Sequence, residues 1–417
     1  MPRNVLTADQ VAARLGVKVE TIYAYVSRGV LGRTVAPDGK TSQFDPAEVE
    51  ELARRGRPRQ GRRRAGAVEV ALATGVTRLD ERGLAYRGHR VDDLAQGSTF
   101  EAVAELLWTG ELPASTDAKL WTAPASNVRL AAAVTAPLPL DAPAIGRLAV
   151  VAAALGAADA DRADRRPSAV VRVGRELLST FAVALPVADP LPGSRRTRAA
   201  GANRATGAHR RIAAALWPHL SALPPTRPRV RVLDAALVLV ADHELATSTL
   251  AARVAASARA DPYAVVSAGL GAVAGPRHGT AASAAHRLLL DADAGGSAQR
   301  SVAAELEAGG GVPGFGHAVY RGVDPRLDVL LARLATIAPR RAMATVDAVL
   351  AAGSDLGAGV ANIDLGLAAL AVATDMPVGA TDAIFAVART AGWIAHALEE
   401  YGEAPLRFRA RAVYTGA

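Results

Sequence analysis

From Gly66 to its end the sequence is a succession of long segments rich in Ala, Leu and Val, broken at intervals by Gly and Pro. Aromatic residues make up only 4% of the 417 residues, which argues against a β-sandwich, because that fold needs β-branched and aromatic strands. A chain of this length can bury a sizeable core and can contain more than one structural unit. These features predict a mainly α-helical protein with close-packed helices.

Several functional classes are excluded by what the sequence lacks. The chain has no cysteine, which rules out a disulfide framework, a thiolate zinc site and a cysteine nucleophile. The stretch HEL at 243–245 is not a zinc-binding HExxH motif, because position 247 is Thr, and we expect no metal site. The N-terminal stretch MPRNVLTADQVAARLG lacks the apolar core of a signal peptide, and no run of about 18 apolar residues occurs. We therefore expect a cytoplasmic protein with no membrane partner.

The positive charge of the chain is concentrated at its front. Residues 1–66 contain 13 Lys or Arg and 7 Asp or Glu, so they carry +6 of the net charge of +8. Seven arginines lie between Arg54 and Arg64, and we interpret residues 55–66 as an Arg-rich linker that self-repulsion keeps extended. Such a linker could also make sequence-independent contacts with nucleic-acid phosphates, and the two interpretations are compatible.

Residues 1–54 have the pattern of a small, separate helical domain. Thr7 and Gln10 form a capping-box pair before an apolar-periodic segment, and PDGK at 37–40 is a turn signal between two segments that could pair as a hairpin. The order helix, tight turn, helix, hairpin, helix resembles a winged helix-turn-helix of the MerR or excisionase type. The residues that this resemblance would place against DNA are Lys18, Thr21, Tyr23, Tyr25 and Arg28. The alternative is a helical dimerisation or docking module that binds no DNA.

Four segments of the larger region hold a histidine or an acid in a distinctive setting, and they lie at 242–244, 275–279, 311–326 and 362–364. His278 and His317 have Gly and Pro nearby, which is typical of residues at the ends of elements beside clefts, where binding residues concentrate. For the other histidines outside these segments we expect structural roles; they are His89, His209, His219, His286 and His396.

The segment GFGHAVYRGVDPR (314–326) looks like the signature of the citrate synthase family. Further segments resemble the family in the same order along the chain, and they lie at 75–113, 241–279, 362–370, 385–400 and 409–416. The resemblance implies a two-domain helical fold over residues 67–417. A large domain would comprise about 67–279 and 376–417, and a small domain of about 280–375 would close over the substrates and exclude water. It also implies a homodimer with sites shared between subunits.

The reaction of this family makes clear demands on residue types. Joining an acyl thioester to a 2-oxo acid requires a base for the weakly acidic α-proton, and donors that stabilise the enolate and polarise the acceptor carbonyl. By the resemblance, Asp364 is the base and His278 is the donor at the thioester carbonyl. His317 would polarise the keto group of the acceptor, and His243 would be a further contact to that substrate.

The anionic groups of both substrates require arginines or exposed backbone, because the planar guanidinium binds a carboxylate with two hydrogen bonds. The resemblance implies that three arginines hold the carboxylates of the acceptor, the last of them reaching across from the partner subunit; these are Arg326, Arg389 and Arg409. Coenzyme A would contact one basic side chain and the backbone of the Gly-rich loop, namely Arg321, Gly314, Phe315 and Gly316.

The implied function is condensation of acetyl-CoA with oxaloacetate to citrate and coenzyme A, without a metal or redox cofactor. One alternative is 2-methylcitrate synthesis from propionyl-CoA, and another is a DNA-binding regulator whose synthase-like body senses a metabolite with little turnover. The chain departs from the family pattern at Ala246, where Asn is common, at Arg277, where an apolar residue is usual, and after Asp364. These departures leave the choice of substrate open.

Overall fold

The computed structural model describes residues 5–15, 17–27, 30–35, 41–46, 48–49, 52, 70–80, 83–188, 211–276, 278–317, 324–409 and 414. The chain divides into two compact units, Met1–Ala73 and Thr74–Ala417. The predicted Arg-rich linker at 55–66 lies outside the described residues, as do Arg28, Arg277 and Arg321.

In its described residues, the N-terminal unit contains the helices α1 (Ala8–Leu15) and α2 (Val19–Ser27) and a three-stranded antiparallel sheet. Its strands are β1 (Leu6–Thr7), β2 (Thr34–Val35) and β3 (Ser42–Phe44), with β3 in the centre. The predicted capping pair forms at the start of α1, where Thr7 N donates to Gln10 Oε1 (2.9 Å) and Gln10 N donates to Thr7 Oγ1 (3.4 Å). The unit has an apolar core of its own, in which Val11, Ile22 and Val49 are fully buried.

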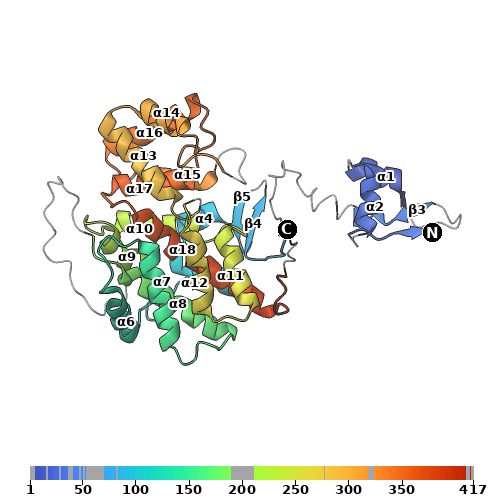
Figure 1. Ribbon diagram of the computed structural model, residues 1–417, viewed down its shortest axis with the longest axis horizontal. Coiled ribbons are helices and arrows are strands. Elements are labelled where there is room, and N and C mark those ends of the chain that lie inside the picture. Colours follow the sequence, from blue (N-terminus) through green and yellow to red (C-terminus); the bar gives the residue numbers. More distant parts are fainter. Residues whose placement is uncertain are drawn as a thin grey trace. The chain divides into compact units, whose positions relative to one another are not determined.

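The larger unit is built mostly from helices (Figure 1), which confirms the prediction of a mainly α-helical protein. Its helices are α4 (Val91–Gly97), α5 (Phe100–Thr109), α6 (Ala125–Thr135), α7 (Ala144–Ala158), α8 (Pro167–Ala184), α9 (Ile212–Leu220), α10 (Arg227–Val240), α11 (Thr247–Ser257), α12 (Pro262–Val273), α13 (Ala281–Gly295), α14 (Ala298–Glu307), α15 (Pro325–Leu334), α16 (Arg340–Asp355), α17 (Ile363–Ala373) and α18 (Ala380–Gly402). Within the described part of this unit, no helix combines the length and apolar character required to cross a membrane.

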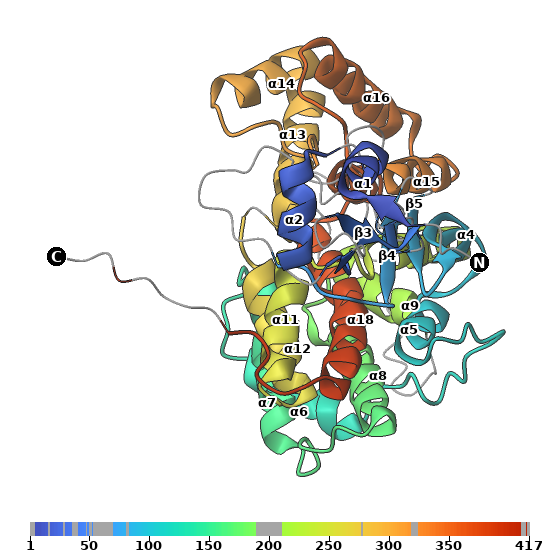
Figure 2. The same cartoon turned by 90° about the vertical axis from the view of Figure 1, so that its right-hand side faces the viewer.

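Helix α18, red in Figure 2, packs against α5, α8, α10, α11 and α12. Its residues are buried without a break from Ala383 to Ala397, as expected for a helix that is surrounded by others on all sides. Small residues allow this close packing. A Cβ on Gly269 of α12 would lie only 2.5 Å from Cδ2 of the fully buried Trp393.

Helices α13 to α17 form a second group, at the top of Figure 1. Helix α13 packs against α14, α16 and α17, and α15 packs against α17, α10 and α4. These helices fall within the predicted small domain of about 280–375. Residues 74–417 nevertheless form one compact unit, so the further division into a large and a small domain stays a prediction.

A short antiparallel sheet lies beside the helices and consists of β4 (Thr77–Asp80), β5 (Gly83–Tyr86) and β6 (His89–Arg90) in that order. Thr77 pairs with Tyr86 at the end of the hairpin opposite the Asp80–Gly83 pair, and both residues are buried. The Tyr86 hydroxyl donates to the carbonyl oxygen of Asp242 (2.9 Å), just after the end of α10. The sheet therefore holds the backbone next to His243, which is one of the predicted substrate contacts.

Candidate active site

The four segments singled out in the sequence meet in one region of the larger unit. The rings of His243 and His317 lie edge to face with their centroids 5.3 Å apart. The charge of Arg389 influences the pKa of His243, His278 and Asp364, so this one guanidinium lies near residues from three of the segments. The residues of the cluster come from the segment after α10, the turn after α12, the loop before α15 and the start of α17.

His278 is a neutral imidazole with a defined tautomer. Its Nε2 lies 2.8 Å from Ser248 Oγ, and the Ser248 backbone N–H also donates to Nε2 (3.4 Å). Trp393 Nε1 donates to the same Ser248 oxygen (3.2 Å), which leaves the serine hydroxyl hydrogen for His278. Burial, aided by the charge of Arg389, lowers the pKa of His278 to about 4. At neutral pH, therefore, Nε2 accepts and Nδ1 carries a proton that it can donate.

The glycine-rich loop that contains His317 is attached to the residues just before α17. Asn362 N donates to Gly314 O (2.9 Å), Gly316 N donates to Val360 O (2.7 Å), and Asn362 Nδ2 donates to Gly316 O (2.7 Å). Gly314 adopts a left-handed conformation (φ 82°), and a Cβ there would lie 2.9 Å from Leu365 Cβ. Only glycine fits at this position. The three hydrogen bonds hold the loop rigidly, so it is not a loose connector.

Phe315 lies in this loop with its side chain turned into the protein. Its backbone forms an isolated antiparallel bridge with Ala361. Its ring covers Gly353 of α16 so closely that a Cβ on that glycine would overlap the ring. The side chain thus anchors the loop to α16, which leaves the glycine backbone on either side as the part that a ligand could approach.

Asp364 lies in the first turn of α17, where Asn362 acts as the helix cap by accepting a hydrogen bond from Asp364 N (2.9 Å). Burial is the main cause that raises the pKa of Asp364 to about 6, and the nearby carboxylates of Asp324 and Asp382 act in the same direction. The positive charges of Arg326 and Arg389 oppose this shift. A carboxyl group with such a pKa is ionised at neutral pH and is still basic enough to accept a proton from a weak acid.

Asp324 holds Arg326 in place beside His317. The guanidinium donates twice to this carboxylate, from Nε to Oδ1 (2.9 Å) and from Nη2 to Oδ2 (2.8 Å). Oδ2 also accepts from Ile363 N (3.0 Å), so that one fully buried acid joins the starts of α15 and α17. Arg326 Nη2 lies 3.5 Å from His317 Nε2, and burial together with this cation lowers the pKa of His317.

His243 stands on a strained piece of backbone directly after α10. The next residue, Glu244, has a left-handed conformation (φ 49°), which a residue with a side chain adopts only when its surroundings enforce it. Burial, and then the charges of Arg326 and Arg389, lower the pKa of His243 well below its usual range. The ring is therefore uncharged and acts as a neutral hydrogen-bonding group.

Arg389 is a buried cation, with only 2% of its surface exposed. Its Nε donates to Val240 O (2.9 Å), and its guanidinium carbon lies 4.6 Å from the centre of the Phe385 ring. Its Nη1 is buried and has no hydrogen-bond partner among the described residues. Because an unsatisfied buried donor is costly, this atom is a candidate to bind an anionic ligand.

The cluster as a whole combines three capabilities. Asp364 can take up a proton, the neutral histidines can donate hydrogen bonds to carbonyl oxygens, and the buried cations Arg326 and Arg389 can hold carboxylates. These are the parts needed for proton abstraction next to a carbonyl group and for addition of the resulting carbanion to an acidic acceptor.

Among the predicted catalytic and substrate-binding residues that the structure describes, Arg409 lies outside the cluster. It is exposed, and it makes no hydrogen bond or ion pair with the described residues of the chain. Two residues that position the cluster were not identified from the sequence, Ser248 at His278 and Asp324 at Arg326. Asp324 belongs to the VDPR part of the motif, and its spacing from Arg326 was a usable signal; nothing in the sequence pairs Ser248 with His278.

The chain is similar to known proteins over most of its length. The model of the citrate synthase C-terminal domain matches residues 67–411. The 2-methylcitrate synthase of Shewanella oneidensis is 28% identical over 354 residues, with 82% of this chain and 90% of the relative covered. The citrate synthase of Haloferax volcanii is 30% identical over 343 residues, with 80% and 89% covered.

A solved structure shares the fold. It is the ternary complex of citrate synthase from the thermophilic archaeon Thermoplasma acidophilum with carboxymethyl coenzyme A and oxaloacetate, at a TM-score of 0.67 and 24% identity, with 83% of this chain and 94% of that chain covered. The family match spans most of the chain and begins directly after the predicted Arg-rich linker at 55–66. The chain belongs to the citrate synthase family.

Proposed function

We propose that this protein condenses a short acyl-CoA with oxaloacetate, forming citrate from acetyl-CoA or 2-methylcitrate from propionyl-CoA. The cluster around Arg389 supports the proposal, because it offers a base, three hydrogen-bonding imidazoles with lowered pKa and two buried cations in one place. Relatives named for each of the two products align over at least 80% of the chain, so both acyl donors remain candidates.

In the proposed reaction Asp364 removes a proton from the α-carbon of the acyl group. Its pKa of about 6 supports this role, since the carboxylate is ionised at neutral pH and has enhanced basicity. His278 donates its Nδ1 proton in a hydrogen bond to the thioester oxygen, where the negative charge of the enolate develops. The hydrogen bond from Ser248 to Nε2 supports this tautomer.

The acceptor is held and polarised on the other side of the cluster. Arg326 and Arg389 bind its carboxylates, His317 donates to its keto oxygen, and His243 makes a further contact. The unpartnered Nη1 of Arg389 supports the carboxylate role, because a carboxylate would satisfy it. Arg326 is already oriented by two hydrogen bonds to Asp324, so it loses little freedom on binding.

Coenzyme A contacts the backbone of Gly314, Phe315 and Gly316 in this proposal, with Arg321 near a phosphate group. The left-handed Gly314 and the inward-facing Phe315 ring support backbone contact at this loop. Arg409 completes the acceptor site of a second subunit in a homodimer. Its exposure and its lack of partners within the described part of its own chain are compatible with that role.

A thiol-release assay tests the proposal. Purified protein is mixed with oxaloacetate and either acetyl-CoA or propionyl-CoA, and free coenzyme A is measured with a thiol reagent. We expect release with at least one donor, and loss of release in Asp364→Asn. The donor with the higher kcat/KM identifies the product, and absence of release with every short acyl-CoA and 2-oxo acid tested would refute the proposal.

A second candidate function concerns the N-terminal unit, which we propose to be a winged helix-turn-helix that binds DNA. Support comes from α1 and α2, joined by a short turn over a separate core, together with a three-stranded sheet. Lys18 and Tyr23 are exposed and Thr21 is half-buried, so these side chains are accessible. Tyr25 packs against the core of the unit and has less freedom to reach a ligand.

A gel-shift titration tests this second proposal. The full chain and a fragment starting at residue 67 are titrated with duplex DNA at low and moderate salt. We expect only the full chain to bind, with affinity that falls steeply as salt is raised, because phosphate contacts release counterions. Equal, weak binding by both proteins would leave the N-terminal unit with a docking role instead.

A further inference from the structure

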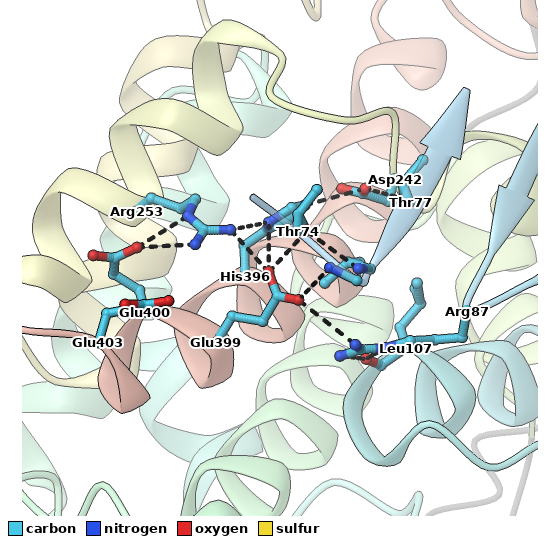
Figure 3. A network of polar contacts seen from close by, with 12 residues as sticks. Thr74, Thr77, Arg87, Leu107, Asp242, Arg253, His396, Glu399, Glu400 and Glu403 are labelled. Atoms are coloured by element: carbon cyan, nitrogen blue, oxygen red, sulfur yellow. Dashed lines mark hydrogen bonds and ion pairs between the residues drawn. The ribbon is translucent and has the colours of Figure 1, made fainter. Parts of the chain in front are cut away.

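A line of buried polar side chains runs alongside α18 and connects the C-terminal segment with the candidate active site. Figure 3 shows the part of this line that includes Glu400, Arg253, His396 and Asp242. We call it the buried network and define it by five residues in order: Arg407, Glu400, Arg253, His396 and Asp242. Every member except Arg407 has at most 1% of its side chain exposed. From the sequence we expect a structural role for His396, and in the structure this residue lies between Arg253 and Asp242 in the buried network.

The middle of the buried network fixes the tautomer of His396. Arg253 Nη1 lies 3.0 Å from His396 Nδ1, and a guanidinium can only donate, so Nδ1 must accept. The proton of the neutral ring is then on Nε2, which donates to Asp242 Oδ2 (3.2 Å). Glu399 lies 3.9 Å from the same Nδ1, too far for a hydrogen bond, and its Oε2 accepts from Arg253 instead (2.9 Å).

The inner end of the buried network holds Asp242, the residue directly before His243. Its side chain accepts from Thr77 Oγ1 (2.5 Å) as well as from His396. Its backbone is held by Tyr86, whose hydroxyl accepts from Asp242 N (3.1 Å) and donates to Asp242 O (2.9 Å). Asp242 is thus fixed through both backbone and side chain, immediately before the strained residues that carry the His243 ring.

The outer end holds the C-terminal segment. Arg407 makes two hydrogen bonds to the carboxylate of the fully buried Glu400, both 2.7 Å long. The backbone N–H groups of Leu406 and Arg407 donate to O (2.9 Å) and Oγ (3.2 Å) of Ser257 on α11. These bonds fix the position and direction of the chain two residues before Arg409.

Stability alone does not account for such an arrangement. Taking several ions out of water is costly, and a buried ion pair is often no more stabilising than well-packed apolar residues of the same size. What these directed hydrogen bonds do provide is a fixed geometry at the groups that they join. Here one end lies at His243, and the other lies at the segment that carries Arg409.

We propose that the buried network positions the subsite for the 2-oxo acid: Asp242 orients His243 within its own chain, and Arg407 directs the segment that presents Arg409 to the partner subunit. The proposal rests on the proposed function and names positioning residues for it, none of which touches a substrate. It distinguishes the two substrates, because both ends of the buried network serve the acceptor and neither serves coenzyme A.

Two variants test the two ends. Arg407→Gln acts at the outer end, where the side chain is 27% exposed and Glu400 keeps its hydrogen bond from Arg253. His396→Leu removes both hydrogen bonds at the centre, and His396→Gln retains one donor and one acceptor for comparison. Arg341→Gln is the matched control, because Arg341 also makes two hydrogen bonds to one carboxylate, Asp293, but on an exposed surface of α16.

For each variant we would measure kcat, the KM for oxaloacetate, the KM for the acyl-CoA and the thermal midpoint. In Arg407→Gln and His396→Leu we expect the KM for oxaloacetate to rise about tenfold, less than the roughly hundredfold that a 1 Å misplacement can cost. The KM for the acyl-CoA should be unchanged, His396→Gln should recover most of the affinity, and the control should match the wild type.

The outcomes separate this inference from the proposed function. A wild-type protein that releases no thiol refutes both. A wild type that turns over, with Arg407→Gln and His396→Leu leaving both KM values unchanged or raising them equally, refutes only the positioning role. If His396→Leu does not fold, Arg407→Gln alone decides between the same two results.

Discussion

Replacing the proposed base should make the protein more stable. Burial raises the pKa of Asp364 from its ordinary value of 3.8 to about 6, so the folded state opposes ionisation of this carboxyl group. An Asp whose pKa is raised on folding stabilises the protein only in its protonated form, and that contribution is lost as the pH rises through the folded pKa. In Asp364→Asn the side chain keeps its shape and cannot ionise, so the variant escapes this loss.

The magnitude follows from the shift of about two pKa units, at 1.36 kcal/mol per unit. Well above pH 6 the ionised carboxylate costs the wild type about 3 kcal/mol of unfolding free energy relative to an uncharged side chain. At pH 5 the same linkage gives about 1.6 kcal/mol, and near pH 4 the difference is only about 0.6 kcal/mol. The advantage of the variant should therefore grow with pH and level off above pH 7.

Equilibrium urea unfolding of both proteins at pH 5 and pH 8 measures this difference, and the thiol-release assay is run in parallel. We expect the variant to be more stable at both values, with the larger gain at pH 8, and to release no coenzyme A. Strain of this kind at a catalytic group is a known source of opposition between stability and activity. A variant that is equally stable or less stable than the wild type at pH 8 would refute the reasoning.

Three further substitutions test other parts of the site. Ser248→Ala removes the hydroxyl donor at His278 and leaves a buried indole N–H unsatisfied, so we expect a loss of about 1–3 kcal/mol in unfolding free energy and a fall in kcat; an unchanged kcat would contradict the tautomer assignment. Asp324→Asn breaks a buried ion pair, which should cost about 3–5 kcal/mol by urea unfolding. It also removes a negative charge that raises the pKa of the base, so the acid limb of kcat/KM should move to lower pH, and a shift to higher pH would contradict the charge assignment. Gly392→Ala would press a methyl group against the buried carboxylate of Asp242, and we expect a lower thermal midpoint and weaker oxaloacetate binding. A variant with the thermal midpoint and oxaloacetate affinity of the wild type would contradict the close packing at this position.

Much of the fold was accessible from the sequence, because helix periodicity and capping are local. The pair Thr7 and Gln10 was predicted from its spacing, and the structure forms it. The residues of the cluster were predicted by a resemblance, which carries over the order of motifs along the chain. The structure then brings His243, His278, His317 and Asp364 together.

What the sequence could not supply were the partners of those residues, which depend on contacts between distant segments. Ser248 and His278 are separated by 30 residues, and Asp242 and His396 by 154. No local pattern encodes such a pair, so His396 was indistinguishable from any histidine in a buried helix. The partners of Arg409 cannot be found within one chain, because its proposed site lies in a second subunit.

The hydrogen bonds between residues 314–316 and 360–362 have a consequence for how the protein would move during turnover. The loop proposed to contact the coenzyme and the helix start that carries Asp364 are joined by Asn362 and by backbone, so they form one rigid piece. Any closing motion that brings the loop onto the coenzyme must carry the base with it over the same path. The alignment between base and acyl group is then set within this piece and is independent of how far the rest of the protein closes.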